Sequence, residues 1–340
     1  TTPLRTPKYL AYPFALARMV REAVAAGATY DALVAQHSIS AVAAGQLRTQ
    51  LRVPVVFNLL DCLTGFMETW PPLLMPRQIA RALVRYELGL PRRYQADGVL
   101  TVSDELRNRV VARGYPAARV LAAYYGFDAD RFTPSSPHHE SPSGKAPMVV
   151  MHGSFDHHHL GPIALQAVRH VAQCRPDVRF RFVGPLTPAL RTFAGSVRRH
   201  VPRANLELTG FVPYIDIPAQ LADATVGLTP YQPSSGTHCA FVAKTVEYLG
   251  LGLPVVSTPL QSSLQYYAGL RGITFSDDAG TDFGPAVLRW LDLPQSERSA
   301  AVEPARLKVH RELNWPTLCA RATDFVETVA QSPSTLPASR

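Results

Sequence analysis

The segment from Thr229 to Thr258 combines small residues with charged side chains in a spacing suited to a phosphorylated ligand. A predicted strand ends at the start of this segment, a loop with Ser235, Gly236 and Thr237 follows, and a helix then begins. The loop would present free backbone N–H groups and the positive end of a helix dipole, and both favour a bound phosphate. The sequence therefore predicts a phosphate-binding loop here.

Two charged residues follow this loop on the predicted helix. Lys244 could place a point charge beside a pyrophosphate, and Glu247 could accept hydrogen bonds from a pair of sugar hydroxyl groups. Residues three positions apart on a helix also form ordinary surface ion pairs. The spacing by itself favours the surface pair.

A second candidate loop, His152–Pro162, follows another predicted strand and carries the adjacent histidines His157, His158 and His159. Gly153 permits a close approach of the backbone to a ligand. Three adjacent histidines cannot all reach one metal ion from a helix or strand without distortion, so we expect no metal site. A histidine that donates a hydrogen bond to phosphate or sugar is the functional interpretation, and a solvated polar loop is the alternative.

Polar residues also follow two strands predicted earlier in the chain. Asp61 follows a buried strand that ends near Asn58, and it is either a catalytic or acceptor-binding carboxylate or a helix N-cap or turn residue. His37 follows the preceding strand and could contact an acceptor, although a histidine satisfied within its loop is the favoured interpretation. On the next helix, Glu87 and the arginines after it resemble a solvated basic face that could meet an anionic lipid.

The composition excludes several classes of protein. Of 340 residues, 46% are hydrophobic and 18% charged, which is typical of a folded globular chain and not of a disordered one. No stretch reaches the ~18 apolar residues of a membrane span. The four cysteines are far apart, which argues against a disulfide framework or a structural zinc site and favours a reducing, cytoplasmic location. The net charge of +8 comes from dispersed arginines, so we expect no nucleic-acid partner.

Short apolar runs alternate with amphipathic stretches, which predicts an α/β protein with parallel sheets. In the first part we expect strands at Ala32–Ala35, Val53–Leu60, Gly98–Val102 and Val120–Tyr125, and helices at Ile79–Arg93 and Asp104–Arg113 with Ser103 as an N-cap. In the second part we expect strands at Met148–His152, Arg179–Val183, Leu206–Thr209, Val226–Thr229, Val255–Thr258 and Ile273–Phe275. Helices are predicted at Ile163–Cys174, Ala189–His200, Ile217–Ala222, Phe241–Leu249, Gly284–Leu293, Ser296–Leu313 and Trp315–Gln331.

A Pro/Ser/Gly-rich stretch divides the chain. We predict a first domain at residues 1–134, a linker and hinge at 135–147, a second domain at 148–313, a C-terminal helix at 314–331 and a disordered tail at 332–340. The first domain offers about four strands against six in the second, and the sequence does not begin with methionine. We therefore expect the opening strands of the first domain to be missing.

The stretch Lys244–Val256, KTVEYLGLGLPVV, resembles the K-x-x-E-Y-L-A-x-G-x-P-V-V motif of retaining glycosyltransferases of family 4, which have the GT-B fold. Weaker matches to the same family occur in the same order along the chain. They are Leu100–Leu106, Tyr125–Pro134, Asn205–Val212 and the pair Asn314-Trp315. The resemblance covers roughly residues 30 to 325.

The resemblance implies two Rossmann-like domains that face each other across a cleft. It also implies the transfer of a sugar from a nucleotide diphosphate sugar to an acceptor held by the N-terminal domain, with retention. By similarity Glu247 would bind the ribose and Lys244 would face the diphosphate or the sugar. The other donor-binding candidates are Ser235, Gly236, Thr237, Gly153, Ser154, His157, Gly184, Tyr231, and Phe211 and Val212 at the base. The catalytic candidates are Asp61 and His37 in the first domain.

The sequence departs from the family pattern at two places. The family often has a glutamate where this chain has Cys239, and it often has Arg and Lys where this chain has residues 155–160. One of the histidines, His157 or His159, is a candidate substitute for these cations. We expect no metal or other cofactor.

Several alternatives stay open. The chain could be an inverting transferase with Asp61 as base, or a non-catalytic protein that binds nucleotide sugars. The acceptor could be a glycan, a lipid or a small molecule. The enzyme could contact the inner face of a membrane peripherally.

Overall fold

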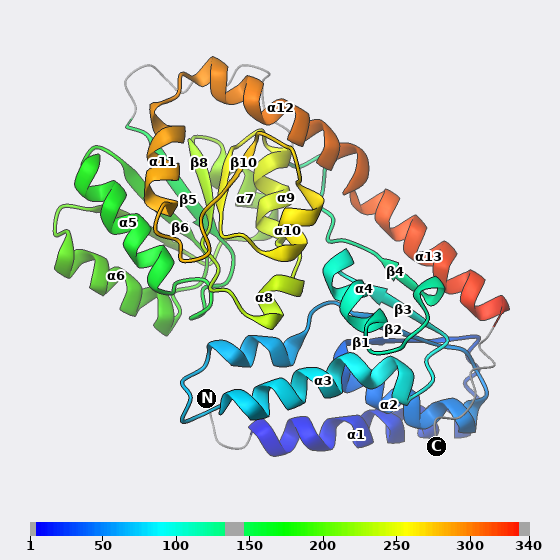
Figure 1. Ribbon diagram of the computed structural model, residues 1–340. Helices are drawn as coiled ribbons and strands as arrows, with labels where there is room; N and C mark the ends of the chain where they lie inside the picture. The colour runs from blue at the N-terminus through cyan, green and yellow to red at the C-terminus, as the bar shows by residue number, and fades with distance from the viewer. Residues whose placement is uncertain (1–4, 133–145, 333–340) are drawn as a thin grey trace. The chain divides into compact units, whose positions relative to one another are not determined.

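The computed structural model of the protein describes residues 5–132 and 146–332, which form two compact units (Figure 1). Among the described residues, the first unit comprises 5–124, 234–240 and 319–332, and the second comprises 125–132, 146–233 and 241–318. Residues 135–145 of the predicted linker and residues 333–340 of the predicted tail lie outside the described residues. No helix of the described chain is both long and apolar enough to cross a membrane.

A four-stranded parallel sheet in the order β1-β2-β3-β4 forms the centre of the first unit. Its strands are β1 (Leu33–Gln36), β2 (Val55–Leu59), β3 (Gly98–Thr101) and β4 (Val120–Ala122). Its helical elements are α1 (Arg5–Ala25), α2 (His37–Leu51), η1 (Leu63–Thr69), α3 (Arg77–Arg93), α4 (Asp104–Val111), η2 (Ala117–Arg119) and α8 (Ser235–Cys239). Helix α13 (Trp315–Gln331) starts in the second unit, and from Cys319 onward it belongs to the first.

One face of α3 is buried because its apolar residues recur at helical spacing. In α3 the buried residues Ala80, Val84 and Leu88 recur every four positions and form one face of the helix. At the start of α4, the predicted N-cap is confirmed because the Ser103 hydroxyl accepts a hydrogen bond from the Leu106 N–H at 3.1 Å. The end of α13 packs its Val329 against the strands β2 and β3.

The second unit contains a six-stranded parallel sheet in the order β10-β9-β8-β5-β6-β7. The strands are β5 (Met148–His152), β6 (Arg179–Val183), β7 (Asn205–Gly210), β8 (Val226–Thr229), β9 (Val255–Ser257) and β10 (Ile273–Phe275). The helical elements are α5 (Pro162–Cys174), α6 (Pro188–His200), η3 (Tyr214–Asp216), α7 (Ile217–Leu221), α9 (Ala243–Gly250), α10 (Gln261–Tyr266), α11 (Phe283–Asp292), α12 (Gln295–Glu312) and the start of α13. The prediction of an α/β chain with two parallel sheets is confirmed.

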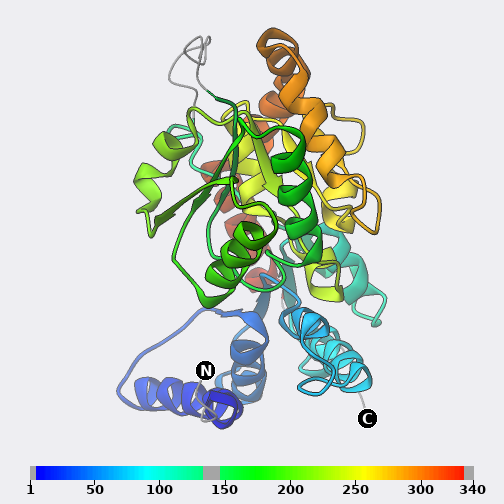
Figure 2. The same ribbon diagram turned by 90° about the vertical axis from the view of Figure 1, so that its left-hand side faces the viewer.

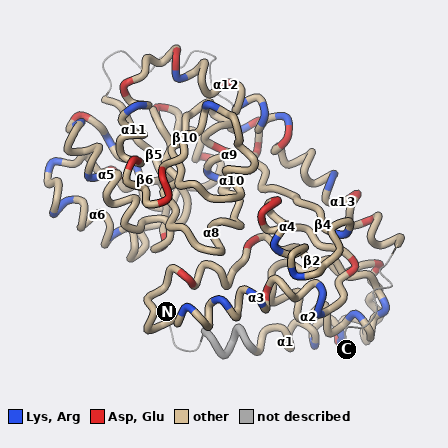
Figure 3. Tube along the Cα trace, viewed as in Figure 1, with Lys and Arg blue, Asp and Glu red and all other residues tan. Residues whose placement is uncertain are grey.

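The main core of the second unit lies between its sheet and three helices. Apolar side chains of β5 and β6 pack there against buried residues of α5, α6 and α11. Both views of the ribbon show α5 and α6, in green, side by side (Figures 1 and 2). Lysine and arginine residues are distributed along both units and not gathered in a single run, as the sequence indicates (Figure 3).

Candidate functional site

The strand order of the second unit has its topological switch point beside β5. This strand pairs with β6 on one side and with β8 on the other. After β5 the chain therefore adds β6 and β7 on one side and then crosses over to add β8, β9 and β10 on the other. In open parallel sheets, ligands bind beyond the carboxyl ends of the strands at such a switch point. The two loops singled out from the sequence, after β5 and after β8, leave the sheet at this point.

Glycines bring the loops after β5, β6 and β7 together. The Gly153 N–H donates to the Val183 carbonyl at 2.8 Å, and the Gly184 N–H donates to the Gly210 carbonyl at 3.0 Å. A Cβ atom at Gly184 would lie 2.0 Å from the Gly153 carbonyl oxygen. Only glycine therefore allows the two loops to approach this closely.

Glu247 is buried, at 7% exposed, and its carboxylate is held by a histidine. Nε2 of His152, the last residue of β5, lies 2.6 Å from Oε2 of Glu247. Because an ionised carboxylate can only accept, the imidazole Nε2 is the donor in this bond. The opposite nitrogen of the ring, Nδ1, is buried and has no hydrogen-bond partner among the described residues.

Two tyrosines complete the surroundings of this pair. The Tyr248 hydroxyl accepts from the His152 backbone N–H at 3.0 Å. Burial, together with the negative charge of Glu247 and a hydrogen bond to it, raises the pKa of Tyr214. Glu247 is thus held from two sides, which fixes the direction in which its free lone pairs point.

Lys244 is buried and contacts Tyr231 rather than Glu247. Its Nζ donates to the Tyr231 hydroxyl at 2.9 Å. A Cβ atom at Gly153, whose φ is +104°, would lie 2.8 Å from the Lys244 Cε atom. Since Lys244 and Glu247 are both buried and have different partners, the surface-pair interpretation of their spacing is wrong.

The histidine loop contributes one exposed and two enclosed imidazoles. His157 is exposed, whereas His159 is buried and packs on Tyr231 with ring centroids 4.6 Å apart. Burial, opposed by Asp156 and reinforced by the charge of Lys244, lowers the pKa of His158 to about 4. Burial and then Lys244 lower the pKa of His159 as well. Both of these imidazoles are neutral at pH 7, so neither supplies a positive charge to a pyrophosphate.

One group in the described chain has the geometry of a metal site, and it consists of Asp156, His158 and His159. The donor atoms of the three residues lie within 4.8 Å of one another. His159 Nδ1 already accepts from the Asp156 N–H at 3.1 Å, and the Lys244 ammonium lies close enough to depress the pKa of both histidines. A cation there would be repelled by that charge. The expectation of a metal-free site stays a prediction.

The remaining candidates of the second unit lie at the same edge of its sheet. Ser154 is exposed directly after Gly153. Phe211 follows β7 and is 76% exposed, while Val212 beside it is half-buried. An exposed aromatic ring at this edge is available for stacking against a planar base.

The loop predicted to seat a phosphate belongs to the first unit, unlike Lys244 and Glu247. Ser234 caps α8: its hydroxyl accepts from the Thr237 N–H at 3.1 Å. The Ser235 N–H donates to the Glu68 carboxylate at 2.7 Å, and the Ser235 hydroxyl donates to the same carboxylate at 2.8 Å. The N–H groups of Ser235 and Thr237 are therefore occupied, contrary to the expectation that they are free. A Cβ at Gly236 would clash with the Phe66 backbone at 2.5 Å, so glycine permits this close packing.

The catalytic candidates of the first unit lie after adjacent strands. His37 follows β1 and Asp61 follows β2, and these strands pair in parallel. His37 has a φ of +61°, which is uncommon for a residue with a side chain, and its buried Nδ1 has no partner in the part of the chain described. Burial and then the charge of Glu87 raise the pKa of Asp61 from 3.8 to about 7. A carboxylate in this range suits general-base chemistry near neutral pH.

Glu87 is a residue that the sequence analysis placed wrongly. It is 2% exposed and not part of a solvated face. Its carboxylate accepts from the Thr64 N–H at 2.8 Å, the Thr64 hydroxyl at 2.5 Å and the Leu63 N–H at 3.2 Å. It thereby holds the start of η1, which directly follows the loop that carries Asp61.

Two family models match the sequence, and together they cover most of it. The glycosyl transferase 4-like domain matches residues 1–126, and the model of glycosyl transferases group 1 matches residues 146–292. No curated protein matches the chain at a significant level.

Solved structures with the same fold cover nearly the whole chain. Anabaena Alr3699/HepE, solved in complex with UDP-glucose, is 18% identical, with a TM-score of 0.67 over 94% of this chain and 82% of that one. Sucrose-phosphate synthase from Thermosynechococcus elongatus is 15% identical, with a TM-score of 0.74 over 97% of this chain and 82% of that one. The α,α-trehalose 6-phosphate synthase from Burkholderia multivorans is 16% identical, with a TM-score of 0.72 over 96% and 78%.

Proposed function

The chain belongs to the family 4-like glycosyltransferases with the GT-B fold, and on this premise we propose that it transfers a sugar from a nucleotide diphosphate sugar to an acceptor. The observation that carries the proposal is the buried group of His152, Glu247 and Lys244 at the switch point of the second sheet. Burying one anion and one cation with separate partners costs stability, so a ligand that uses both is the simplest reason for their presence. The likeness to a structure that contains UDP-glucose supports a uridine nucleotide as the donor.

In this proposal each buried charge has a distinct task. Glu247, held by His152, accepts hydrogen bonds from the two ribose hydroxyls of the nucleotide. Lys244 faces the diphosphate and stabilises the charge that develops on it as the bond from the anomeric carbon to the diphosphate oxygen breaks. Phe211 stacks against the base. A fixed ammonium at the diphosphate would make a divalent cation unnecessary, so we expect binding that is independent of magnesium.

The acceptor hydroxyl forms the new bond to the anomeric carbon and gives up its proton. The family resemblance supports retention of the anomeric configuration. The inverting alternative is favoured by one observation, the pKa of Asp61 at about 7, which suits a base that takes this proton. Analysis of the anomeric configuration of the product distinguishes the two reactions.

The test is isothermal titration of the chain with UDP and with GDP, each with and without magnesium. We expect binding of UDP that does not depend on magnesium and that is lost in Glu247→Ala. The matched control is Glu297→Ala, which removes an exposed carboxylate from α12 of the same unit. Binding of neither nucleotide, or equal loss in both variants, would contradict the proposed donor site.

A further inference from the structure

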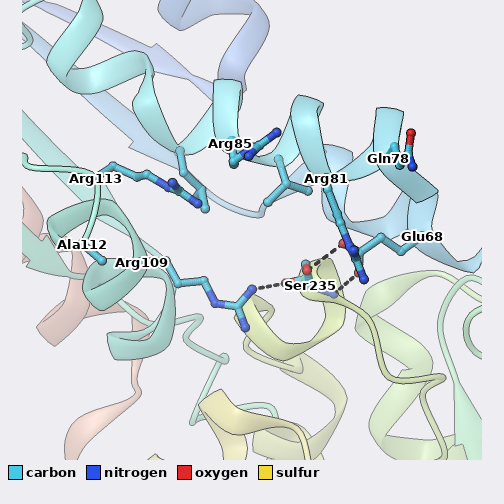
Figure 4. Close-up of a pocket in the computed structure, with 10 residues that line it drawn as sticks. Glu68, Gln78, Arg81, Arg85, Arg109, Ala112, Arg113 and Ser235 are labelled. Atoms are coloured by element: carbon cyan, nitrogen blue, oxygen red, sulfur yellow. Dashed lines mark hydrogen bonds between the residues drawn. The ribbon is translucent and has the colours of Figure 1, made fainter. Parts of the chain in front are cut away.

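The first unit contains a pocket of about 620 Å³ that the proposed donor site does not use. It lies between one face of α3 and one face of α4, and η1 and α8 also contribute to it (Figure 4). This volume is in the range of sites for small molecules. Ten residues line it: Glu68, Gln78, Arg81, Val84, Arg85, Leu88, Arg109, Ala112, Arg113 and Ser235.

Arginine residues from both helices meet in this pocket. Arg81 and Arg85 are one helical turn apart on α3, so their side chains lie on the same side of the helix. Arg109 lies on α4, and Arg113, four positions later, lies two residues beyond the end of this helix. Figure 4 shows these four side chains coming from α3 and from α4 with the turn that follows it. The four arginines come from two separate segments of the sequence, and the fold brings them together at one pocket.

The acidic groups near the pocket, Glu105 and Glu68, are fewer than the four arginines, and only Glu105 forms an ion pair with one of them. Arg109 already binds the Glu105 carboxylate at 2.7 Å and the Ser235 carbonyl at 3.2 Å. Glu68, the acid in the lining, accepts both of its hydrogen bonds from Ser235.

Arg81, Arg85 and Arg113 have no acidic partner within 4 Å among the described residues and are exposed to solvent. Placing like charges around one cavity is unfavourable unless an anion joins them. Guanidinium groups present paired donors that match the oxygens of a phosphate.

We propose that this pocket binds a phosphate monoester, as a ligand separate from the proposed nucleotide donor. A phosphate monoester carries up to two negative charges, which matches the excess of two positive charges that the four arginines have over Glu68 and Glu105. The pocket is much larger than a phosphate ion alone, and the buried Val84 and Leu88 give it an apolar part that an attached group can contact. The ester is either soluble or the headgroup of a lipid.

Titration of the full chain with glycerol 1-phosphate, and with glycerol as the uncharged comparison, tests the soluble form. Co-sedimentation with phosphatidylcholine vesicles, with and without phosphatidic acid, tests the lipid form. We expect the chain to bind either glycerol 1-phosphate or the vesicles that contain phosphatidic acid. We expect no binding to glycerol or to vesicles of pure phosphatidylcholine. We expect Arg81→Gln/Arg85→Gln to weaken this binding by roughly tenfold or more, because each substitution removes a charge-assisted hydrogen bond.

The matched control is Arg198→Gln/Arg199→Gln on α6, which removes the same charge from exposed positions of the second unit. It should bind as the unchanged chain does. Arg113→Gln tests the pocket independently from the other helix. The proposal is overturned by the absence of binding in both arms, or by equal loss in the α3 and α6 double variants.

Titration of the α3 double variant with UDP separates this proposal from the proposed function. Normal UDP binding with lost phosphate binding supports the pocket as a site of its own. Phosphate binding in a chain that binds no nucleotide would refute the donor site and leave the pocket as an anion site.

Discussion

Substitution of His152 by phenylalanine tests whether this histidine acts by holding Glu247. Phenylalanine fills the ring volume beside Tyr248, whose ring centroid lies 5.0 Å from that of the histidine, but it cannot donate to the carboxylate. The 2.6 Å hydrogen bond to Glu247 is then lost, and a buried acceptor remains without it. Leaving a buried acceptor without its donor lowers the free energy of unfolding by about 1–3 kcal/mol.

The effect on nucleotide binding follows from the same geometry. Hydrogen bonds between a carboxylate and the ribose hydroxyls contribute about 1.5–3 kcal/mol, which is roughly a ten- to hundredfold change in Kd. Glu247→Ala should lose all of this. His152→Phe retains the carboxylate but not its orientation, and we expect a smaller loss of roughly tenfold.

The double variant decides how His152 acts. If the histidine works through Glu247, the double variant binds UDP no more weakly than Glu247→Ala alone, because nothing remains to be positioned. Isothermal titration of the four proteins gives the comparison. Additive losses would refute this reasoning and would mean that the unpartnered Nδ1 of His152 contacts the nucleotide itself.

Three further perturbations test other parts of the site. Asp61→Asn should stabilise the protein above pH 7 but not below pH 3.8. Burial raises the pKa of the Asp61 carboxyl from 3.8 to about 7, so the folded state loses about 1.4 kcal/mol of stability for each pH unit between these two values. Melting temperatures of the variant and of the unchanged chain across this pH range measure how much of that stability the substitution restores. Gly153→Ala should weaken UDP binding in titrations, because the added Cβ displaces Lys244. Gly269→Ala is the control: it also places a side chain on a residue with positive φ, but no atom lies within 4 Å of the added Cβ, so UDP binding should not change. Glu87→Gln should lower the melting temperature and move the acid limb of the activity profile to lower pH, since it removes a charge that raises the pKa of Asp61; an unmoved limb would mean that Asp61 is not the titrating group.

The strands could be predicted from sequence because buried parallel strands are short apolar runs between turn signals. Strands β5, β6, β8 and β10 coincide with their predicted ranges, and the others differ by one to three residues at their ends. The region after β8 was harder to predict. The sequence indicates one helix beginning at Phe241, whereas the structure has a separate short helix, α8, before the helix α9. The capping box of Ser234 and Thr237 starts α8, and extended backbone at Ala240 ends it.

The buried charges of the site were harder to predict than its strands, because their partners are distant in sequence. His152 and Glu247 are 95 residues apart, so no local pattern links them, and only the family resemblance indicated Glu247. Glu87 lies 23 residues from Thr64, which it binds. A signal was nevertheless present, since Glu87 lies three positions after Val84 and one before Leu88, within the apolar face of α3. An acid on the apolar face of a helix is buried when that face packs, so it must find donors. Leu63 and Thr64 at the start of η1, close in sequence to Asp61, supply them.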